Sequence, residues 1–291
     1  MDYTSILLSK VKNIIPDRIK KLVKNYVFSG SQSVLRELHT PDAPQEREWY
    51  FKDKIRSENG KVNNFPLPPK NLRMGYPEDN EEYIRRGIKT EQSIRDILKS
   101  NKISIDEESR FMEWGCATGR VLRWFDDEAR SAEGWGVDQH ERSIRWNKDN
   151  LSPPFEFVTC TSYPHLPFED GYFDFVFGIS VFTHMEFLID AWLMEIRRIL
   201  RDSGYGIFTI HDENSIDFFK ERGSKPFWMP EGIALSDVRN HGVYVVNGDG
   251  WENTYTVFHT EWIKHEWGKY FEVVEVRPRA EHSQSAVVLK K

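Results

Sequence analysis

The stretch Arg110-Phe-Met-Glu-Trp-Gly-Cys-Ala-Thr-Gly-Arg120 decides the fold of this chain. It opens as a short apolar run that contains the acid Glu113, turns through a glycine-containing segment, and continues as the opening of a helix. A strand, such a turn and a helix together bring backbone N–H groups and a helix N-terminus against a ligand. We expect Gly115 to permit the sharp turn, Gly119 to let the helix pack closely on the strand, and the small Ala117 to leave room for the ligand.

Three further segments follow at suitable distances. Gly134-Trp-Gly-Val-Asp138 is typical of a second strand that ends in an acid, and a carboxylate there can accept both hydroxyls of a ribose. Leu166 to Ser180 is typical of a loop, a turn and a strand. Glu186 to Leu200 has the pattern of an amphipathic helix, and a strand from Tyr205 to Ile210 follows it.

Strands that alternate with helices predict an α/β protein with a doubly wound, Rossmann-like sheet. Two C-terminal strands, expected to be antiparallel, complete a mostly parallel, seven-stranded sheet, and an N-terminal helical extension precedes it. The expected strands are 110–114, 134–138, 155–159, 173–179, 205–210, 271–276 and 285–289. The expected helices begin at Gly119 and span 141–150, 186–200 and 261–269, the last capped by Thr260. Asn80 and Thr90 are expected to cap two earlier helices, the second with Ile94, Ile97 and Leu98 on one face.

The order of these segments resembles the class I S-adenosylmethionine-dependent methyltransferases over roughly residues 80–291. The matching segments are Glu113-x-Gly-x-Ala-x-Gly119, Asp138, Leu166-Pro-Phe, Phe173-Asp-Phe-Val and Glu195-Ile-Arg-Arg-Ile-Leu200. The runs Ser180-Val-Phe-Thr-His184 and Arg120-Val-Leu-Arg123 resemble a bacterial subgroup that acts on small molecules or surface glycans. The resemblance implies S-adenosylmethionine as cofactor and a methyl transfer as the reaction.

Ligands of doubly wound sheets bind outside the carboxyl ends of the strands. The cofactor-binding candidates there are Glu113, Gly115, Ala117, Gly119, Asp138, Gln139, Thr161, Ser162 and Ser180. Many relatives carry an acid for the adenine amino group four residues before Leu-Pro-Phe, where this chain has Ser162. In the family the helices before the first core strand lie over the cofactor. Tyr83, Arg85 and Gly87 are therefore candidates for its methionine end, and an ordinary solvated helix is the alternative.

Methyl transfer needs mainly the placement of a nucleophile, and a neutral hydroxyl acceptor also needs its proton removed. His184, a few residues after the fourth strand, is the candidate general base, and His211, after the fifth, is its rival. Either histidine can instead cap a helix or fill a polar niche. Catechol-type relatives use a metal held by an acid after the fourth strand, where this chain has Ser180, so we expect no metal. The Asn-Pro-Pro-aromatic signature of enzymes that methylate bases or protein amides is absent.

These features favour a metal-independent O-methyltransferase for a small molecule or a glycan such as a sugar nucleotide. A nicotinamide-dependent oxidoreductase shares the strand, turn and terminal acid, but its G-x-G-x-x-G spacing is not present. A catalytically silent cofactor-binding or scaffold protein remains the alternative from another class.

The composition indicates a cytoplasmic protein that does not bind nucleic acid. The net charge is −6, and only two cysteines occur, Cys116 and Cys160, neither with a metal-ligand spacing. No apolar run reaches the length of a membrane span.

We predict an N-terminal arm and linker over residues 1–75 and a methyltransferase domain over 76–291. Within residues 1–30, lysines and arginines alternate with an apolar stripe. This segment is either a helical arm that packs on protein or an interfacial anchor on the inner face of the membrane. Residues 214–253 are rich in aromatic side chains in an irregular context, and they predict either a cover over the substrate or a packed structural insertion.

Overall fold

The computed structural model describes residues 58–62, 65–226, 238, 240–246 and 254–291. All of them belong to one compact unit, Asp53–Lys291. The basic segment within residues 1–30 lies outside the described residues, so its role stays a prediction, as does a domain boundary near residue 75.

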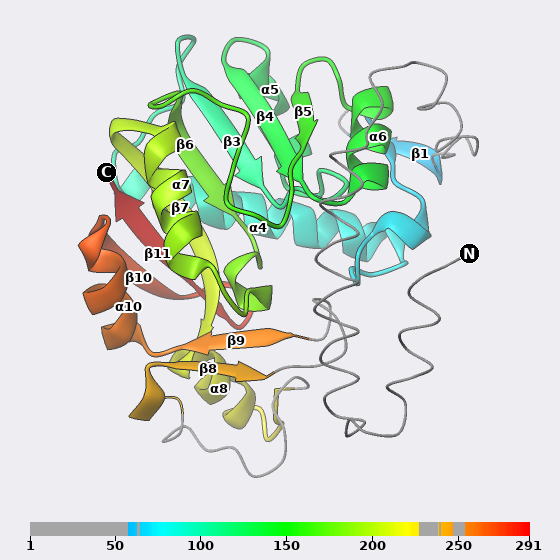
Figure 1. Ribbon diagram of the computed structural model, residues 1–291. Coiled ribbons are helices and arrows are strands. Elements are labelled where there is room, and N and C mark those ends of the chain that lie inside the picture. Colours follow the sequence, from blue (N-terminus) through cyan, green and yellow to red (C-terminus); the bar gives the residue numbers. More distant parts are fainter. Residues whose placement is uncertain (1–57, 63–64, 227–237, 239, 247–253) are drawn as a thin grey trace, which may run out of the picture. The chain divides into compact units, whose positions relative to one another are not determined.

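The central sheet follows the predicted doubly wound plan (Figure 1). Its strands are β3 (Arg110–Trp114), β4 (Glu133–Asp138), β5 (Glu156–Thr159), β6 (Phe173–Gly178), β7 (Leu200–Asp212), β10 (Glu272–Glu281) and β11 (Gln284–Lys290). They lie in the order β10-β11-β7-β6-β3-β4-β5, with β7 to β5 mutually parallel and β11 antiparallel to both β7 and β10. The chain moves outward from β3 to β5 and then returns to β6 on the other side of β3. The switch point of the sheet, where ligands bind, therefore lies at the carboxyl ends of β3 and β6.

Part of the region predicted to be irregular forms regular structure. Helix α8 (Glu213–Lys220) follows β7 directly, and its N-cap Asp212 accepts a hydrogen bond from the Ser215 amide at 3.1 Å. Strand β8 (Val243–Val246) pairs with β9 (Tyr255–Phe258) in antiparallel orientation. Strand β9 in turn pairs in parallel with the carboxyl end of β7. The prediction of an irregular segment over residues 214–253 was therefore wrong for residues 214–220 and 243–246. A second small sheet, β1 (Glu58–Val62) with β2 (Phe65–Leu67), precedes η1 (Lys70–Leu72).

Helix α4 (Asn80–Ser100) is one continuous helix where the sequence predicted two. Its N-cap is Asp79, whose side chain accepts from the Glu82 amide at 2.8 Å, and Thr90 lies inside the helix instead of capping one. Gly87 does not break the helix because its missing Cβ allows close packing: a Cβ there would lie 2.6 Å from the Arg120 carbonyl oxygen. The shared apolar face is confirmed, since Ile94, Ile97 and Leu98 are buried.

The other helices follow the prediction with shifted ends. Helix α6 (Glu141–Asn150) has the predicted bounds, and α7 (Ile189–Ile199) begins after the 3-10 turn η3 (Phe182–His184). The helix expected from Gly119 is instead the short pair η2 (Leu122–Phe125) and α5 (Asp126–Ala129). Helix α10 (Thr260–Glu266) begins at Thr260 and continues as η5 (Trp267–Lys269). Its N-cap is His259 with no side-chain cap bond, so the predicted Thr260 cap was wrong.

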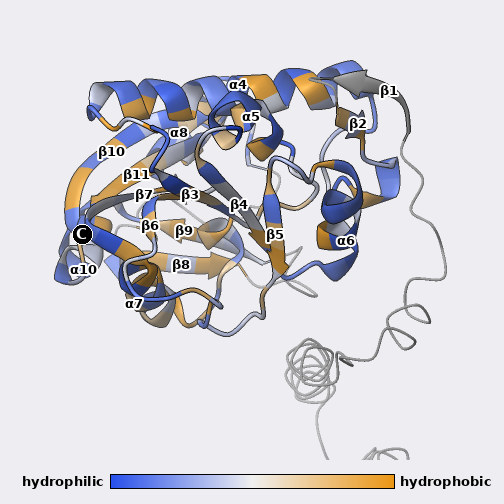
Figure 2. Cartoon of the chain, turned by 90° about the horizontal axis from the view of Figure 1, so that it is seen from above, coloured by the Kyte–Doolittle hydropathy of each residue, from blue (hydrophilic) through white to orange (hydrophobic). Residues whose placement is uncertain are grey.

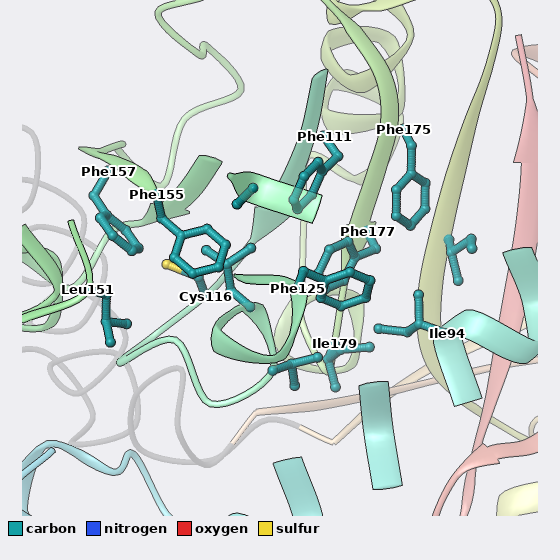
Figure 3. Packing of buried hydrophobic residues seen from close by; sticks show 14 of the residues in the cluster. Ile94, Phe111, Cys116, Phe125, Leu151, Phe155, Phe157, Phe175, Phe177 and Ile179 are labelled. Carbon is teal, nitrogen blue, oxygen red and sulfur yellow. The ribbon is translucent and has the colours of Figure 1, made fainter. Parts of the chain in front are cut away.

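Helices cover both faces of the sheet (Figure 2). Alternate residues of β3 point to opposite faces, as strand geometry requires. Phe111 joins Phe125, Phe177 and Ile94 in the core beneath α4 (Figure 3). Trp114 joins the core beneath α7 and α10, where its ring centroid lies 4.6 Å from that of Trp192. Among the described residues, no helix is long and apolar enough to cross a membrane.

Two motifs that are distant in sequence hold each other in place. The Leu166 amide donates to Glu195 Oε1 at 2.6 Å, and Arg198 donates to the carbonyl oxygens of Leu166 at 3.1 Å and Phe168 at 2.7 Å. Arg198 also bonds Glu195 at 2.7 Å. Helix α7 therefore fixes the loop that enters β6, which explains why the Leu166-Pro-Phe and Glu195-Ile-Arg-Arg motifs occur together.

Substituting Glu195→Ala should lower the free energy of unfolding by about 1–3 kcal/mol, because it leaves the Leu166 amide and Arg198 without their shared acceptor. Urea denaturation at neutral pH measures the loss. Arg197→Ala, on the exposed side of the same helix, is the matched control and should change stability much less. Equal losses of stability in the two variants would show that the hydrogen bonds of Glu195 to the Leu166 amide and to Arg198 do not stabilise the fold.

Candidate active site

The turn after β3 has a backbone that only a few residue types tolerate. Gly115 has φ +77°, and a Cβ there would lie 2.5 Å from Val181 Cγ2, which confirms why the sharp turn needs glycine. Gly119 has φ +65°, and its close neighbour is Leu151 Cδ1, at 2.5 Å from the position of a Cβ. The predicted close packing at Gly119 is thus made with the residue after α6 and not with the strand. The Gly115 amide donates to the Val137 carbonyl oxygen at 2.7 Å and ties the turn to β4.

Asp138, the last residue of β4, faces this turn. Its Oδ2 accepts from the Ala117 amide and its Oδ1 from the His140 amide, both at 2.7 Å. Burial raises the pKa of the Asp138 carboxyl, and these backbone hydrogen bonds oppose the rise. Each carboxylate oxygen keeps further acceptor capacity, so Asp138 can hold the turn and still accept hydroxyl groups.

A cavity opens beside the turn and beneath α4. Its lining consists of Arg73, Tyr76, Tyr83, Glu113, Gly115, Cys116, Ala117, Thr118, Arg120 and Ile179. Of the predicted cofactor residues, Glu113, Gly115 and Ala117 therefore lie together. Tyr83, predicted for the methionine end, also lines the cavity, and its hydroxyl lies 3.0 Å from Thr118 Oγ1. Arg85 does not line it: its side chain is 64% exposed and pairs with Glu82.

Glu113 is buried in the wall of this cavity. Its Oε2 accepts from the Leu122 amide at 2.8 Å, so the carboxyl ties β3 to the start of η2. Burial raises the pKa of Glu113 to about 8, and the nearby Arg120 opposes the rise. At neutral pH this carboxyl is therefore largely protonated in the ligand-free protein.

The remaining cofactor candidates lie along the carboxyl edge of the sheet without lining the cavity. Gln139 and Ser162 are exposed. Thr161 Oγ1 bonds the backbone of Tyr163, and Ser180 Oγ bonds the Gln284 side chain on β11. These positions stay predictions.

The rings of the two candidate bases both lie near that of Tyr255, a β9 residue that sequence reasoning missed. His184 ends η3, and its ring centroid is 5.3 Å from that of Tyr255, while the His211 centroid is 6.5 Å from it. His184 Nδ1 lies 2.9 Å from the Thr254 carbonyl oxygen. A carbonyl oxygen can only accept, so Nδ1 carries the proton of the neutral ring and Nε2 is the unprotonated ring nitrogen.

His211 differs from the prediction in its position and in the basicity of its ring. It lies inside β7 and not after it, because pairing with Val257 of β9 extends the strand to Asp212. The residue is only 6% exposed, and burial, with His184 nearby, lowers the pKa of His211 to about 3. So weak a base is poorly suited to remove a proton near neutrality.

Sequence reasoning also missed Arg73, Tyr76, Thr118 and Arg120 in the cavity wall. Arg120 follows the turn directly, and that adjacency was a usable signal, whereas Arg73 and Tyr76 come from a segment without a clear pattern. No group of three or more histidine, cysteine or acidic side chains with a metal-binding arrangement occurs within the part of the chain that the structure describes.

Comparisons with known proteins agree with this architecture. Residues 112–208 match a family model described as a methyltransferase domain. A crystal structure of a Pyrococcus horikoshii OT3 protein superposes with a TM-score of 0.52 at 19% identity, covering 76% of this chain and 95% of that one. An S-adenosylmethionine-dependent methyltransferase from Mesorhizobium loti gives a TM-score of 0.50 at 13% identity, covering 68% and 98% of the two chains. At these identities the superpositions show the fold alone.

The matched model covers the strands and the turn that build the cavity, from β3 into β7. Residues 112–208 therefore match a methyltransferase domain, and the fold is that of solved S-adenosylmethionine-dependent methyltransferases.

The Glu113 carboxyl should make stability depend on pH. Its pKa is about 8 in the folded protein against a usual 4.5, so its contribution is fully present below pH 4.5 and is lost as the pH rises toward 8. Without ligand, the free energy of unfolding should fall by about 1–2 kcal/mol between pH 6.5 and 8 because of this group. His211 does not add to this slope, since its lowered pKa acts below pH 6.5.

Substituting Glu113→Gln should flatten that slope, as measured by urea unfolding at the two pH values. Glu108→Gln, in an exposed loop, is the control and should keep the wild-type slope. The same slope in Glu113→Gln and in the wild type would contradict the raised pKa.

Proposed function

We propose that the protein is a metal-independent O-methyltransferase for a small molecule or a glycan acceptor such as a sugar nucleotide, with His184 as general base. The observation that carries this proposal is the hydrogen bond between His184 Nδ1 and the Thr254 carbonyl oxygen. It orients the ring and makes Nε2 the basic nitrogen of the neutral imidazole. A base is needed for a hydroxyl acceptor because a neutral hydroxyl is a poor nucleophile until its proton leaves.

The residues around the turn after β3 fit S-adenosylmethionine as the cofactor. Asp138 has acceptor capacity for the two ribose hydroxyls, and the positive φ values of Gly115 and Ala117 open the turn toward the cavity. The cofactor supplies a methyl group that its sulfonium already activates. The protein therefore contributes orientation of the acceptor, exclusion of water and, at His184 Nε2, a place for the proton.

One feature supports the metal-independent part of the proposal. Ser180, which follows β6 where catechol-type relatives carry a metal-binding acid, bonds Gln284 through its hydroxyl. The other reading, a cofactor-binding protein without turnover, predicts cofactor binding with no methylation of any sugar nucleotide or other hydroxyl acceptor in an assay with labelled S-adenosylmethionine.

Asp138→Ala should weaken S-adenosylhomocysteine binding by about 1–3 kcal/mol, the range for a hydrogen bond to a charged group. Calorimetry on the folded variant measures the change. Asp149→Ala, an exposed acid on α6, is the control and should bind as the wild type does. Unchanged affinity in Asp138→Ala would contradict the proposal that Asp138 binds the ribose.

His184→Ala should lower turnover about 10²–10⁴-fold, the usual contribution of general-base catalysis, with cofactor affinity nearly unchanged. The acidic limb of the pH–rate profile should disappear, since the group that must lose its proton is gone. Assays should contain EDTA, because the proposed chemistry needs no metal. If the variant keeps its turnover and the wild-type pH profile, His184 is not the general base.

A further inference from the structure

The turn between β10 and β11, formed by His282 and Ser283, lies at the carboxyl edge of the sheet. The Ser215 hydroxyl of α8 donates to the Ser283 carbonyl oxygen at 2.7 Å. Gln284, directly after the turn, hydrogen-bonds the Ser180 hydroxyl beyond β6 at 2.9 Å. The turn therefore borders the edge at which ligands of doubly wound sheets bind.

Helix α4 connects this turn to the wall of the cavity beneath the helix. Thr90 Oγ1 lies 2.8 Å from Glu281 Oε2, and the Ser93 hydroxyl donates to the Ala280 carbonyl oxygen at 2.5 Å. Thr90 also accepts a hydrogen bond at 3.1 Å from Arg120, which lines the cavity. The turn and the cavity beside the turn after β3 therefore share one residue of α4 as a contact.

Three side chains with nitrogen donors surround the Phe218 ring of α8. The guanidinium carbon of Arg222 lies 3.6 Å from the ring centroid and that of Arg279 lies 5.7 Å from it, while the His282 ring centroid is 4.9 Å away. Phe218 is buried, whereas the other three residues are exposed. The ring therefore holds two guanidinium groups and an imidazole, from two distant parts of the chain, close together at the surface.

The positive charge of these arginines is only partly neutralised. They share one acid, Glu221, whose carboxylate lies 4.0 Å from Arg222 and 2.5 Å from Arg279. Arg222 also donates to the Phe218 carbonyl oxygen at 2.9 Å. One carboxylate and one carbonyl oxygen cannot accept all the N–H donors of two guanidinium groups. Lys89 of α4 adds a further cation, because it is exposed and forms no ion pair within the part of the chain that the structure describes.

His282 lies in a positive environment. Burial lowers the pKa of His282, and the nearby Arg86, Lys89 and Arg222 lower it further, whereas Glu281 opposes the shift. The chain as a whole carries a net charge of −6, so this surface differs in sign from the average of the protein. Such a local excess of positive charge attracts anionic ligands.

Two residues of this surface adopt a backbone conformation that favours glycine. The φ angle is +56° at Arg279 and +54° at His282. A residue with a Cβ adopts this region at a cost that glycine avoids. Strained backbone conformations of this kind cluster at ligand-binding sites, where the surrounding structure holds them. Arg279 and His282 combine such a conformation with side chains that meet at one aromatic ring.

We propose that Arg222, Arg279 and His282, with Lys89 beside them, bind a diphosphate group of the methyl acceptor. This inference rests on the proposed function and narrows its acceptor from a small molecule or glycan to a sugar nucleotide. Planar guanidinium groups match phosphate oxygens with two parallel hydrogen bonds. In a sugar nucleotide the sugar hydroxyls and the diphosphate lie on different parts of the molecule, so a hydroxyl can lie at His184 while the diphosphate lies at the turn.

The test is calorimetry with inorganic diphosphate, in metal-free buffer, on protein saturated with S-adenosylhomocysteine. The wild type should bind diphosphate, and Arg222→Gln and Arg279→Gln should each weaken that binding about 10-fold, as expected for the loss of a charge-assisted hydrogen bond. Lys89→Gln should weaken it several-fold, and this variant removes charge without removing an ion pair from the fold. In a panel of nucleoside diphosphates, at least one should bind about 10-fold more tightly than inorganic diphosphate, since the nucleoside adds contacts of its own.

Arg130→Gln removes an exposed arginine elsewhere and is the matched control for net charge; it should bind diphosphate as the wild type does. A wild type that binds no diphosphate, or Arg279→Gln and Lys89→Gln variants that bind it as Arg130→Gln does, would overturn the proposal. If no nucleoside diphosphate binds more tightly than inorganic diphosphate, a sugar nucleotide is not the acceptor. Methylation of a neutral glycan by a protein that binds no diphosphate contradicts only the diphosphate site. Diphosphate binding without methylation of any hydroxyl acceptor supports the site and contradicts the proposed methyl transfer.

Discussion

The hydrogen bond from the Ala117 amide to Asp138 is the contact on which the site depends. At 2.7 Å it joins the middle of the turn after β3 to the end of β4, and the Gly115 amide adds a second tie through the Val137 carbonyl oxygen. The turn can only meet both partners with Gly115 and Ala117 at positive φ. Backbone strain and side-chain hydrogen bonding therefore fix one another, and the carboxylate that orders the turn is the one proposed to bind the ribose.

Helix α4 closes the other side of the same turn. Gly87 allows its backbone to approach the Arg120 carbonyl oxygen, and Tyr83 reaches Thr118 at 3.0 Å. Thr90, one turn further along, contacts the Arg120 side chain. Tyr83, Gly87 and Thr90 are spaced three to four residues apart, so they lie on one face of the helix. Contacts at these three positions fix how α4 packs on the turn. A change in the register of α4 would move all three contacts together.

The sequence predicted the central sheet well because its signals are local. Strands β3 and β6 are mostly apolar and largely buried, and a glycine at or directly after the last residue marks the carboxyl edge of each. The features it missed depend on contacts between distant segments. Strand β9 exists through pairing with the end of β7, and that pairing also places His211 inside a strand. Likewise α4 continues past Gly87 because the packing against Arg120 outweighs the low helix propensity of glycine.

The same distant pairing separates the two histidines that the sequence could not rank. Strand β9 covers His211, and burial among its neighbours lowers the pKa of that ring to about 3. The residue just before the strand, Thr254, instead offers its carbonyl oxygen to His184 and fixes the proton on Nδ1. Strand β9 therefore lowers the basicity of one histidine, and the residue before the strand orients the other. Since both effects come from residues 254–258, the difference between the two histidines is set by tertiary structure and not by the local sequence around either ring.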